Sequence, residues 1–249
     1  MSLLVVDGVC MGPSRDTGWV PVLGDMCFDV ERGEVVAIVG TRRAGKTTLL
    51  EIAAGIRRPE RGSVRLGERE LGGMPERRRV QLRGRELVFL DRSGLSQQRR
   101  VERIVAWPLS LARGRREAHS RAWQMLERVG ARDCAGRPWN ELSPWEQVLV
   151  GLARGFAPNP ELVVVDDLLD GLGSEGTTQA SRLLRSLIAE TPSRPGVLMS
   201  TSDRDSAVFA DRVWSLGGGK LKATSGHRHS NADVIDLKRA AGSDCGGGP

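Results

Sequence analysis

The sequence predicts an α/β fold built around a mainly parallel β-sheet. Three observations predict it: short apolar runs rich in β-branched residues, helical patterns between them, and a glycine-rich turn directly after the first run. Strands that are apolar on both faces are typical of parallel sheets covered by helices on each side. Alternation of such strands with helices is the pattern of α/β domains.

The expected strands share short length, apolar composition and a polar or glycine boundary. They are residues 34–40, 63–66, 87–91, 162–166, 197–201 and 212–216. A helix is expected over 47–54, because it stops at Gly55 with Pro59 beyond. A second helix is expected over 117–129, where the apolar residues fall on one helical face.

The middle of the chain, residues 92–149, lacks a comparable strand signal and is predicted to be a mostly helical insert. It would divide a core of residues 1–91 and 150–225, which together with the insert forms one domain over 1–225. Residues 226–249 are polar and close on three glycines and a proline, so we expect a partly disordered tail.

Composition excludes several classes of protein. The 249 residues carry a net charge of +6, and only four of the 37 basic residues are lysines. That charge would suit a phosphate-bearing partner or an anionic membrane surface, although arginine spread along the whole chain favours genomic base composition as its cause. The longest apolar run, 35–39, is far short of the roughly 20 residues that span a bilayer. Aromatic residues for stacking are scarce, so no nucleic-acid partner is predicted.

The four cysteines are widely separated and form no Cys-x-x-Cys pair, and the N-terminus lacks the basic lead of a signal peptide. These features predict reduced thiols in an intracellular protein.

The turn after the first buried strand matches the phosphate-loop pattern G-x-x-x-x-G-K-[ST], with a strand before it and a helix after it. Backbone N–H groups of such a turn and of the helix N-terminus converge on phosphate oxygens. Lys46 is expected to reach the β- and γ-phosphates, and the Thr47 hydroxyl to bind Mg²⁺. ATP or GTP binding follows. The residues expected to contact the nucleotide are Gly40, Thr41, Arg42, Arg43, Ala44, Gly45, Lys46, Thr47 and Thr48.

Asp166 ends the apolar run 162–165 and is the natural second element of the site. A carboxylate at the C-terminal end of a parallel strand faces the crevice where ligands bind, so Asp166 is expected to hold Mg²⁺ directly or through water. The alternative is an aspartate that caps the next turn.

These motifs resemble the nucleotide-binding subunits of ATP-binding cassette (ABC) transporters over nearly the whole chain. The segments that carry the resemblance are 22–40, 49–64, 83–89, 140–166 and 210–213. Within the family the chain looks most like the lipoprotein-release, macrolide-export and cell-division subfamily. The resemblance implies a RecA-like P-loop core, an N-terminal antiparallel β part and a helical subdomain. It also implies Mg²⁺ and ATP as cofactors, and docking on a membrane permease at the cytoplasmic face of the membrane.

The family's signature motif, Leu-Ser-Gly-Gly followed by Gln or Glu, is altered here to Leu142-Ser143-Pro144-Trp145-Glu146. In the family this motif approaches the nucleotide bound to the opposite subunit. Pro144 lacks an N–H donor, although it fits at a helix start. Trp145 is bulky where the backbone should come close, while Ser143 keeps its hydroxyl. We expect this signature to engage ATP poorly.

Other departures fall on catalytic positions. The resemblance places Asp167 at the general-base glutamate and Ser202 at the switch histidine. Leu90 replaces the Q-loop glutamine, with neighbouring Asp91 a candidate Mg²⁺ ligand, and Gly173 replaces the D-loop aspartate. No tyrosine exists to stack on adenine, and Trp19 is the candidate substitute.

Phosphoryl transfer depends on positioning, so these losses are expected to compound. The sequence therefore predicts Mg-ATP binding with slow or absent hydrolysis. Because the family dimerises head to tail, a heterodimer with an intact cassette is favoured over a homodimer with two weakened sites. The alternatives are a scaffold or regulatory subunit that uses bound ATP, and an ordinary active ATPase whose substitutions are tolerated.

Overall fold

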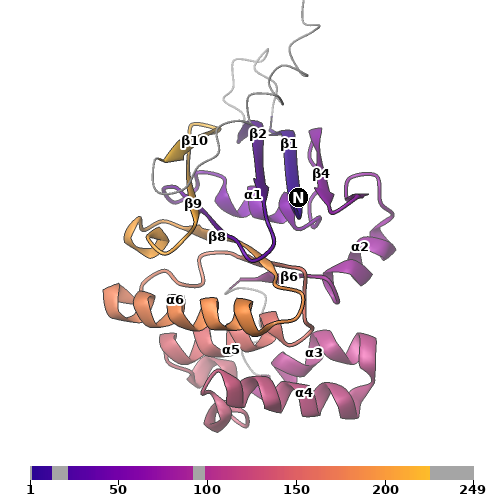
Figure 1. Ribbon diagram of the computed structural model, residues 1–249, viewed down its shortest axis with the longest axis vertical. Coiled ribbons are helices and arrows are strands. Elements are labelled where there is room, and N and C mark those ends of the chain that lie inside the picture. Colours follow the sequence, from indigo (N-terminus) through magenta and orange to yellow (C-terminus); the bar gives the residue numbers. More distant parts are fainter. Residues whose placement is uncertain (1, 13–21, 92–98, 225–249) are drawn as a thin grey trace, which may run out of the picture.

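The structure is a computed structural model that describes residues 2–12, 22–91 and 99–224 (Figure 1). Trp19 and the predicted tail at 226–249 lie outside the described residues. Two sheets lie above one another, and helices cover the larger sheet on both faces (Figure 1).

The larger sheet has six strands in the order β10-β9-β3-β8-β7-β6. All neighbours pair in parallel except β10, which is antiparallel to β9. Gly218 and Gly219 join these two strands with φ values of 56° and 68°, as a two-residue hairpin turn with both residues left-handed requires. The strands are β3 (Val35–Val39), β6 (Leu87–Leu90), β7 (Leu162–Val165), β8 (Gly196–Thr201), β9 (Arg212–Gly217) and β10 (Lys220–Thr224).

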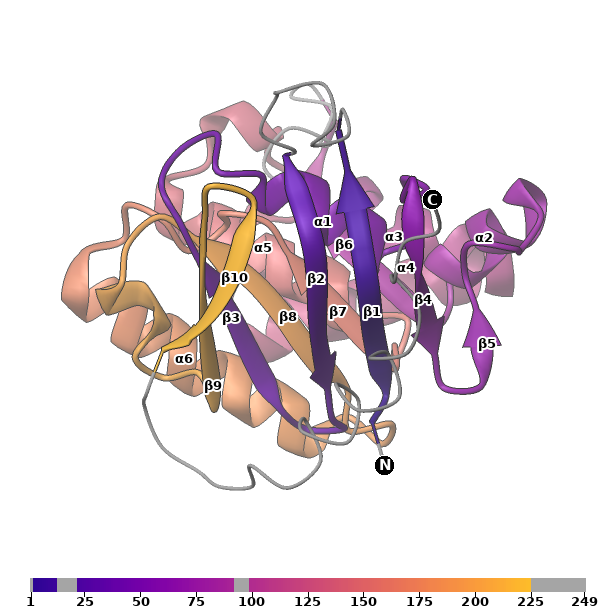
Figure 2. The same cartoon turned by 90° about the horizontal axis from the view of Figure 1, so that it is seen from above.

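The smaller sheet is antiparallel, with the order β2-β1-β4-β5. It lies over the larger sheet, as Figure 2 shows from above. This is the N-terminal antiparallel part that the family resemblance implied. Its strands are β1 (Leu4–Met11), β2 (Leu23–Val30), β4 (Arg61–Leu66) and β5 (Arg69–Glu70).

Six α-helices complete the described fold. They are α1 (Lys46–Ala53), α2 (Glu76–Arg83), α3 (Val101–Arg113), α4 (Arg115–Arg128), α5 (Pro144–Phe156) and α6 (Gly173–Glu190). Residues of β3 alternate between two buried clusters: Val35 and Ala37 join the one formed with α3 to α6, and Val36 and Ile38 join the one formed with α1 and the smaller sheet. The larger sheet is therefore buried on both faces, which explains its continuously apolar strands.

The predicted fold class is confirmed, and each predicted strand and helix lies within about two residues of an observed one. No element of its own was predicted for α2, α6 or β10, and β1, β2 and β5 were covered only by the antiparallel part that the family resemblance implied. The first two turns of α6 contain two glycines and two threonines, and four of the five β10 residues are exposed, so neither has a strong local signal. Helix α5 runs without a break through residues 149 and 150, and the division into core and insert stays a prediction.

Candidate nucleotide site

The phosphate loop connects β3 to α1 through two glycines that no other residue could easily replace. Gly45 has a φ of 99°, and a Cβ there would lie 3.1 Å from Val22. A Cβ on Gly40 would lie 2.7 Å from the Leu216 carbonyl oxygen. Arg43 is also left-handed, with a φ of 64°. Alternation of left- and right-handed residues turns successive N–H groups toward one side, which makes an anion-binding hollow.

Lys46 crosses this loop, with its side chain only 4% exposed. Its Nζ donates hydrogen bonds to the carbonyl oxygens of Gly40 at 2.9 Å and Thr41 at 3.4 Å. The same ammonium lies 3.7 Å from Oδ1 of Asp167. The loop therefore holds its positive charge in a fixed place beside the strand-end carboxylates.

A cavity of about 220 Å³ opens at the loop. Three cationic side chains among its lining residues favour a polyanion. Val22 was not predicted as a site residue, because an apolar residue before a strand carries no chemical signal. Gly40, Thr41 and Ala44 shape the loop without lining the cavity. The lining residues are Val22, Arg42, Arg43, Gly45, Lys46, Thr47, Thr48 and Asp167.

Two carboxylates, Asp166 and Asp167, follow the end of β7. Ser200 on the adjacent β8 contacts both, with its Oγ 2.6 Å from Oδ1 of Asp166 and 2.9 Å from Oδ1 of Asp167. Burial raises the pKa of Asp166, and hydrogen bonds from Ser200 and Thr47 oppose that shift. Asp166 and the Thr47 hydroxyl therefore meet at the mouth of the loop.

The donor set fits Mg²⁺. This ion prefers oxygen ligands and is usually held by one or two side chains together with substrate phosphates. The Thr47 hydroxyl hydrogen-bonds the Asp166 carboxylate, so the two groups are close enough to bind one ion together.

Asp91, the third predicted ligand, follows β6 and is not part of the cavity lining. Burial lowers the pKa of Arg154, and the negative charge of Asp91 opposes that shift. Its role in metal binding stays a prediction.

Ser202, at the predicted switch position, is engaged by Asp170. The Ser202 amide and hydroxyl donate to Oδ2 of Asp170 at 3.1 Å and 2.5 Å. The hydroxyl of Thr201 donates to the other Asp170 oxygen at 2.5 Å. Sequence reasoning missed both Asp170 and Ser200. The available signals were a third aspartate within five residues and a serine in an otherwise apolar strand.

The altered signature begins α5 with a complete capping box. Oγ of Ser143 accepts from the Glu146 amide at 3.2 Å, and Oε2 of Glu146 accepts from the Ser143 amide at 2.7 Å. Pro144 occupies the first helical position, where its missing N–H costs little. The Glu146 carboxylate is also held by Arg137 at 2.6 Å, and Trp145 packs partly buried against the helical core.

These contacts lower the pKa of Glu146 to about 2. The Ser143 amide is the largest cause, and the Ser143 and Arg137 side chains add to it.

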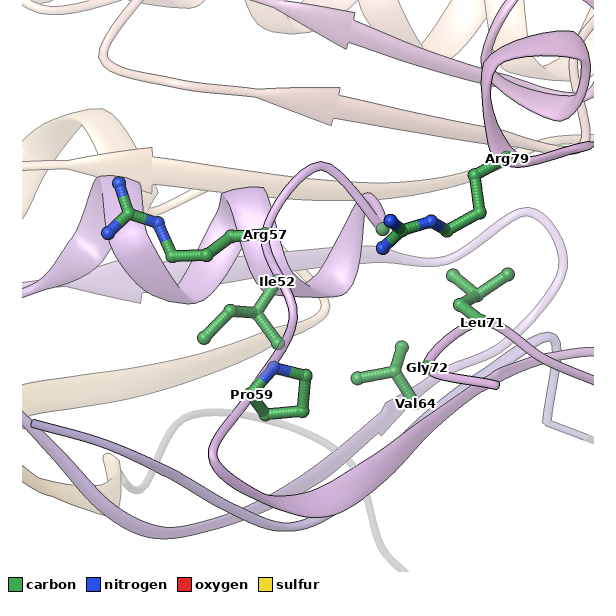
Figure 3. Close-up of a pocket in the computed structure, with 8 residues that line it drawn as sticks. Ile52, Arg57, Pro59, Val64, Leu71, Gly72 and Arg79 are labelled. Atoms are coloured by element: carbon green, nitrogen blue, oxygen red, sulfur yellow. The ribbon is translucent and has the colours of Figure 1, made fainter. Parts of the chain in front are cut away.

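A second depression lies at the other end of α1, between Ile52, Pro59 and Arg79 (Figure 3). It has no room for a water molecule, although the buried Arg79 lines it.

No helix among residues 2–12, 22–91 and 99–224 combines the length and apolar character needed to cross a membrane.

Residues 23–169 match the ABC transporter family. The chain belongs to this family. It is 31% identical over 201 residues to the Fe(3+) ions import ATP-binding protein FbpC 2 of Haemophilus influenzae, covering 80% of this chain and 56% of that protein. It is 29% identical to FbpC 2 of Rhodococcus jostii, covering 95% of this chain and 66% of that protein. The chain thus spans less than two thirds of the length of these relatives.

Among solved structures, the fold is similar to the dimeric post-hydrolysis ATP-binding cassette MJ0796 bound to ADP and Pi. The TM-score is 0.77 at 23% identity, covering 90% of this chain and 99% of that one. At this identity the likeness shows the shared fold alone. The ABC fold is confirmed, whereas the placement in the lipoprotein-release and macrolide-export subfamily stays a prediction.

Proposed function

We propose that this chain is the ATP-binding subunit of an ABC-type membrane transport complex, and that it binds Mg-ATP while hydrolysing it slowly or not at all. The observation that carries the proposal is the contrast between two halves of one site. The phosphate loop keeps its binding groups, while the two positions that serve hydrolysis are bound to neighbouring side chains.

The binding half rests on family membership and on the loop. Lys46 is fixed at the cavity mouth, Arg42 and Arg43 add positive charge, and Thr47 adjoins Asp166. Bound Mg²⁺ would neutralise charge on the β- and γ-phosphates, with Thr47 and Asp166 to hold it. Asp91 and Trp19 are proposed as further contacts to the metal and to adenine.

The hydrolytic half rests on Asp167 and Ser202. A general base must come within hydrogen-bond reach of the attacking water. Asp167 is one methylene shorter than glutamate, and its carboxylate contacts Ser200 and lies near Lys46. Ser202 stands where the family has the switch histidine, so this site has no imidazole. The Ser202 hydroxyl donates to Asp170 and is therefore already engaged.

The partners follow from the family. We propose integral-membrane permease subunits and a second cassette, with the chain peripheral to the cytoplasmic face of the membrane. A heterodimer with an intact cassette is favoured. One site would then keep the partner's intact signature, and the other would keep the partner's general base and switch histidine. The relatives named for Fe(3+) import favour import as the direction of transport.

The test compares ATP binding and turnover by the purified chain alone and by the complex that copurifies with it from its native membrane. We expect micromolar ATP binding, little turnover by the chain alone, and a permease with a second cassette in the complex. Turnover by the chain alone near the enzyme median of about 10 s⁻¹ would support the ordinary ATPase instead. A complex without any permease would support the scaffold.

A further inference from the structure

Ser200 is a polar residue in a strand that is otherwise apolar up to that point. It is the fifth residue of β8 and only 1% exposed, and the four residues before it are also buried. The parallel register pairs Val165 with Met199, so Ser200 lies one step beyond the end of β7. That position sets its hydroxyl against the two aspartates that follow β7.

The hydroxyl makes three contacts. Besides the two carboxylates, at 2.6 Å and 2.9 Å, its oxygen accepts a hydrogen bond from the Asp167 amide at 3.0 Å. A serine hydroxyl has one proton to donate and two lone pairs. The shorter contact, to Asp166, is the better placed to receive that proton.

The amide contact fixes the backbone of Asp167. This residue has a φ of 47°, which is uncommon for a residue other than glycine, although aspartate tolerates it. The hydrogen bond to Ser200 therefore helps to hold the turn that separates the two carboxylates. One side chain sets both the direction of Asp166 and the backbone of Asp167.

Thr47 is the other side chain that hydrogen-bonds Asp166 in the described structure. Its oxygen is also the expected Mg²⁺ ligand. With the ion in place, Ser200 is the donor that remains behind the Asp166 carboxylate.

We propose that Ser200 is a positioning residue that orients Asp166 toward Mg²⁺, a role that rests on the proposed Mg-ATP binding. Hydrogen bonds behind a metal ligand fix its orientation, and their loss typically weakens metal affinity by about 10- to 100-fold. The role concerns how strongly Mg²⁺ supports nucleotide binding, not the rate of hydrolysis.

The test uses Ser200→Thr and Ser200→Val, two substitutions of nearly equal volume that differ in the hydroxyl. Calorimetry measures the dissociation constant of ATP with saturating Mg²⁺ and with EDTA. The dissociation constant in EDTA divided by that in Mg²⁺ measures how much Mg²⁺ strengthens ATP binding. This ratio is expected to fall about 10-fold in Ser200→Val and to be unchanged in Ser200→Thr. ATP affinity in EDTA is expected to be the same in both variants.

Thr and Val are both larger than Ser and could disturb the packing at position 200. Ser200→Ala is the control for this effect, because it removes the hydroxyl without adding volume. Its thermal unfolding reports folding, and its Mg²⁺ ratio is expected to match that of Ser200→Val. An unchanged ratio in folded Ser200→Ala and Ser200→Val would overturn the role of Ser200 alone. Absence of any ATP binding by the unsubstituted chain would overturn the proposed function and this inference together.

Discussion

The side chains at the ends of β7 and β8 bind to one another across 31 to 34 residues of sequence. Ser200 contacts Asp166 and Asp167, and Asp170 holds Thr201 and Ser202. The apolar runs predicted the two strands and Asp166 at the end of one of them, and the family resemblance implied the roles of Asp167 and Ser202. It did not predict their pairing, which depends on the register between two distant strands.

Lys46 should carry much of the affinity for nucleotide. We expect Lys46→Met to weaken ATP binding about 10- to 100-fold, since hydrogen bonds to charged groups contribute about 1.5–3 kcal/mol each. Calorimetry of ATP binding measures this. The control is Lys220→Met on exposed β10, which removes the same charge away from the cavity. An equal loss in both variants would show that overall charge, and not the loop, sets the affinity.

Restoring the two altered hydrolytic positions should restore turnover. In the assembled complex, we expect Asp167→Glu combined with Ser202→His to raise kcat about 100-fold, within the range that general acid–base groups contribute. Each single substitution should give much less, because the base and the switch act together. Phosphate release measures the rate, with Asp167→Asn as the inactive control. If the double variant binds ATP but is no faster, the block lies elsewhere, as in the altered signature.

At the scale of elements, the unusual signature sequence at the start of α5 forms an ordinary helix N-terminus. The sequence predicted that Pro144 would fit at a helix start and that Ser143 would keep its hydroxyl. The structure adds a capping box and the Arg137–Glu146 ion pair, which a local pattern could not reveal because Arg137 lies in the preceding loop. The signature is thus a well-formed helix start in spite of its altered residues.

The lowered pKa of Glu146 predicts a pH-dependent contribution to stability. The folded state favours the ionised carboxylate, so its contribution is full above the ordinary pKa of 4.5 and is lost as the pH falls toward about 2. We expect Glu146→Gln to lower the free energy of unfolding at neutral pH. The difference from the unsubstituted chain should shrink as the pH falls from 4.5 toward about 2.

Urea unfolding at several pH values measures this difference. Glu127→Gln, in the exposed Arg132–Glu127 pair, is the control and should show a small difference at each pH. A difference for Glu146→Gln that stayed constant with pH would contradict the pKa assignment.

At the scale of the whole molecule, Arg212 links the two sheets. From β9 it contacts Asp29 on β2 at 2.9 Å and Glu34, just before β3, at 2.5 Å, with its side chain 28% exposed. The sequence analysis attributed the arginine excess to genomic base composition, and Arg212 is one arginine whose contacts the structure shows to be specific. The overall fold was predictable because its strands are locally apolar, but not these links between distant segments.

Arg212→Met should therefore destabilise the fold. Removing one partner leaves two carboxylates without their cation, and we expect the free energy of unfolding to fall by about 2–3 kcal/mol. Arg132→Met, which breaks an exposed pair with Glu127, should change it by less than about 1 kcal/mol. Equal effects of the two substitutions in urea unfolding would contradict the linking role.

The central claim is that this chain keeps ATP rather than consuming it. The most direct measurement incubates the purified chain with Mg-ATP and determines over time whether the bound nucleotide is ATP or ADP. The account predicts that intact ATP stays bound long after a typical ATPase, with a median rate of about 10 s⁻¹, would have converted it. Conversion to ADP within seconds by the chain alone would contradict it.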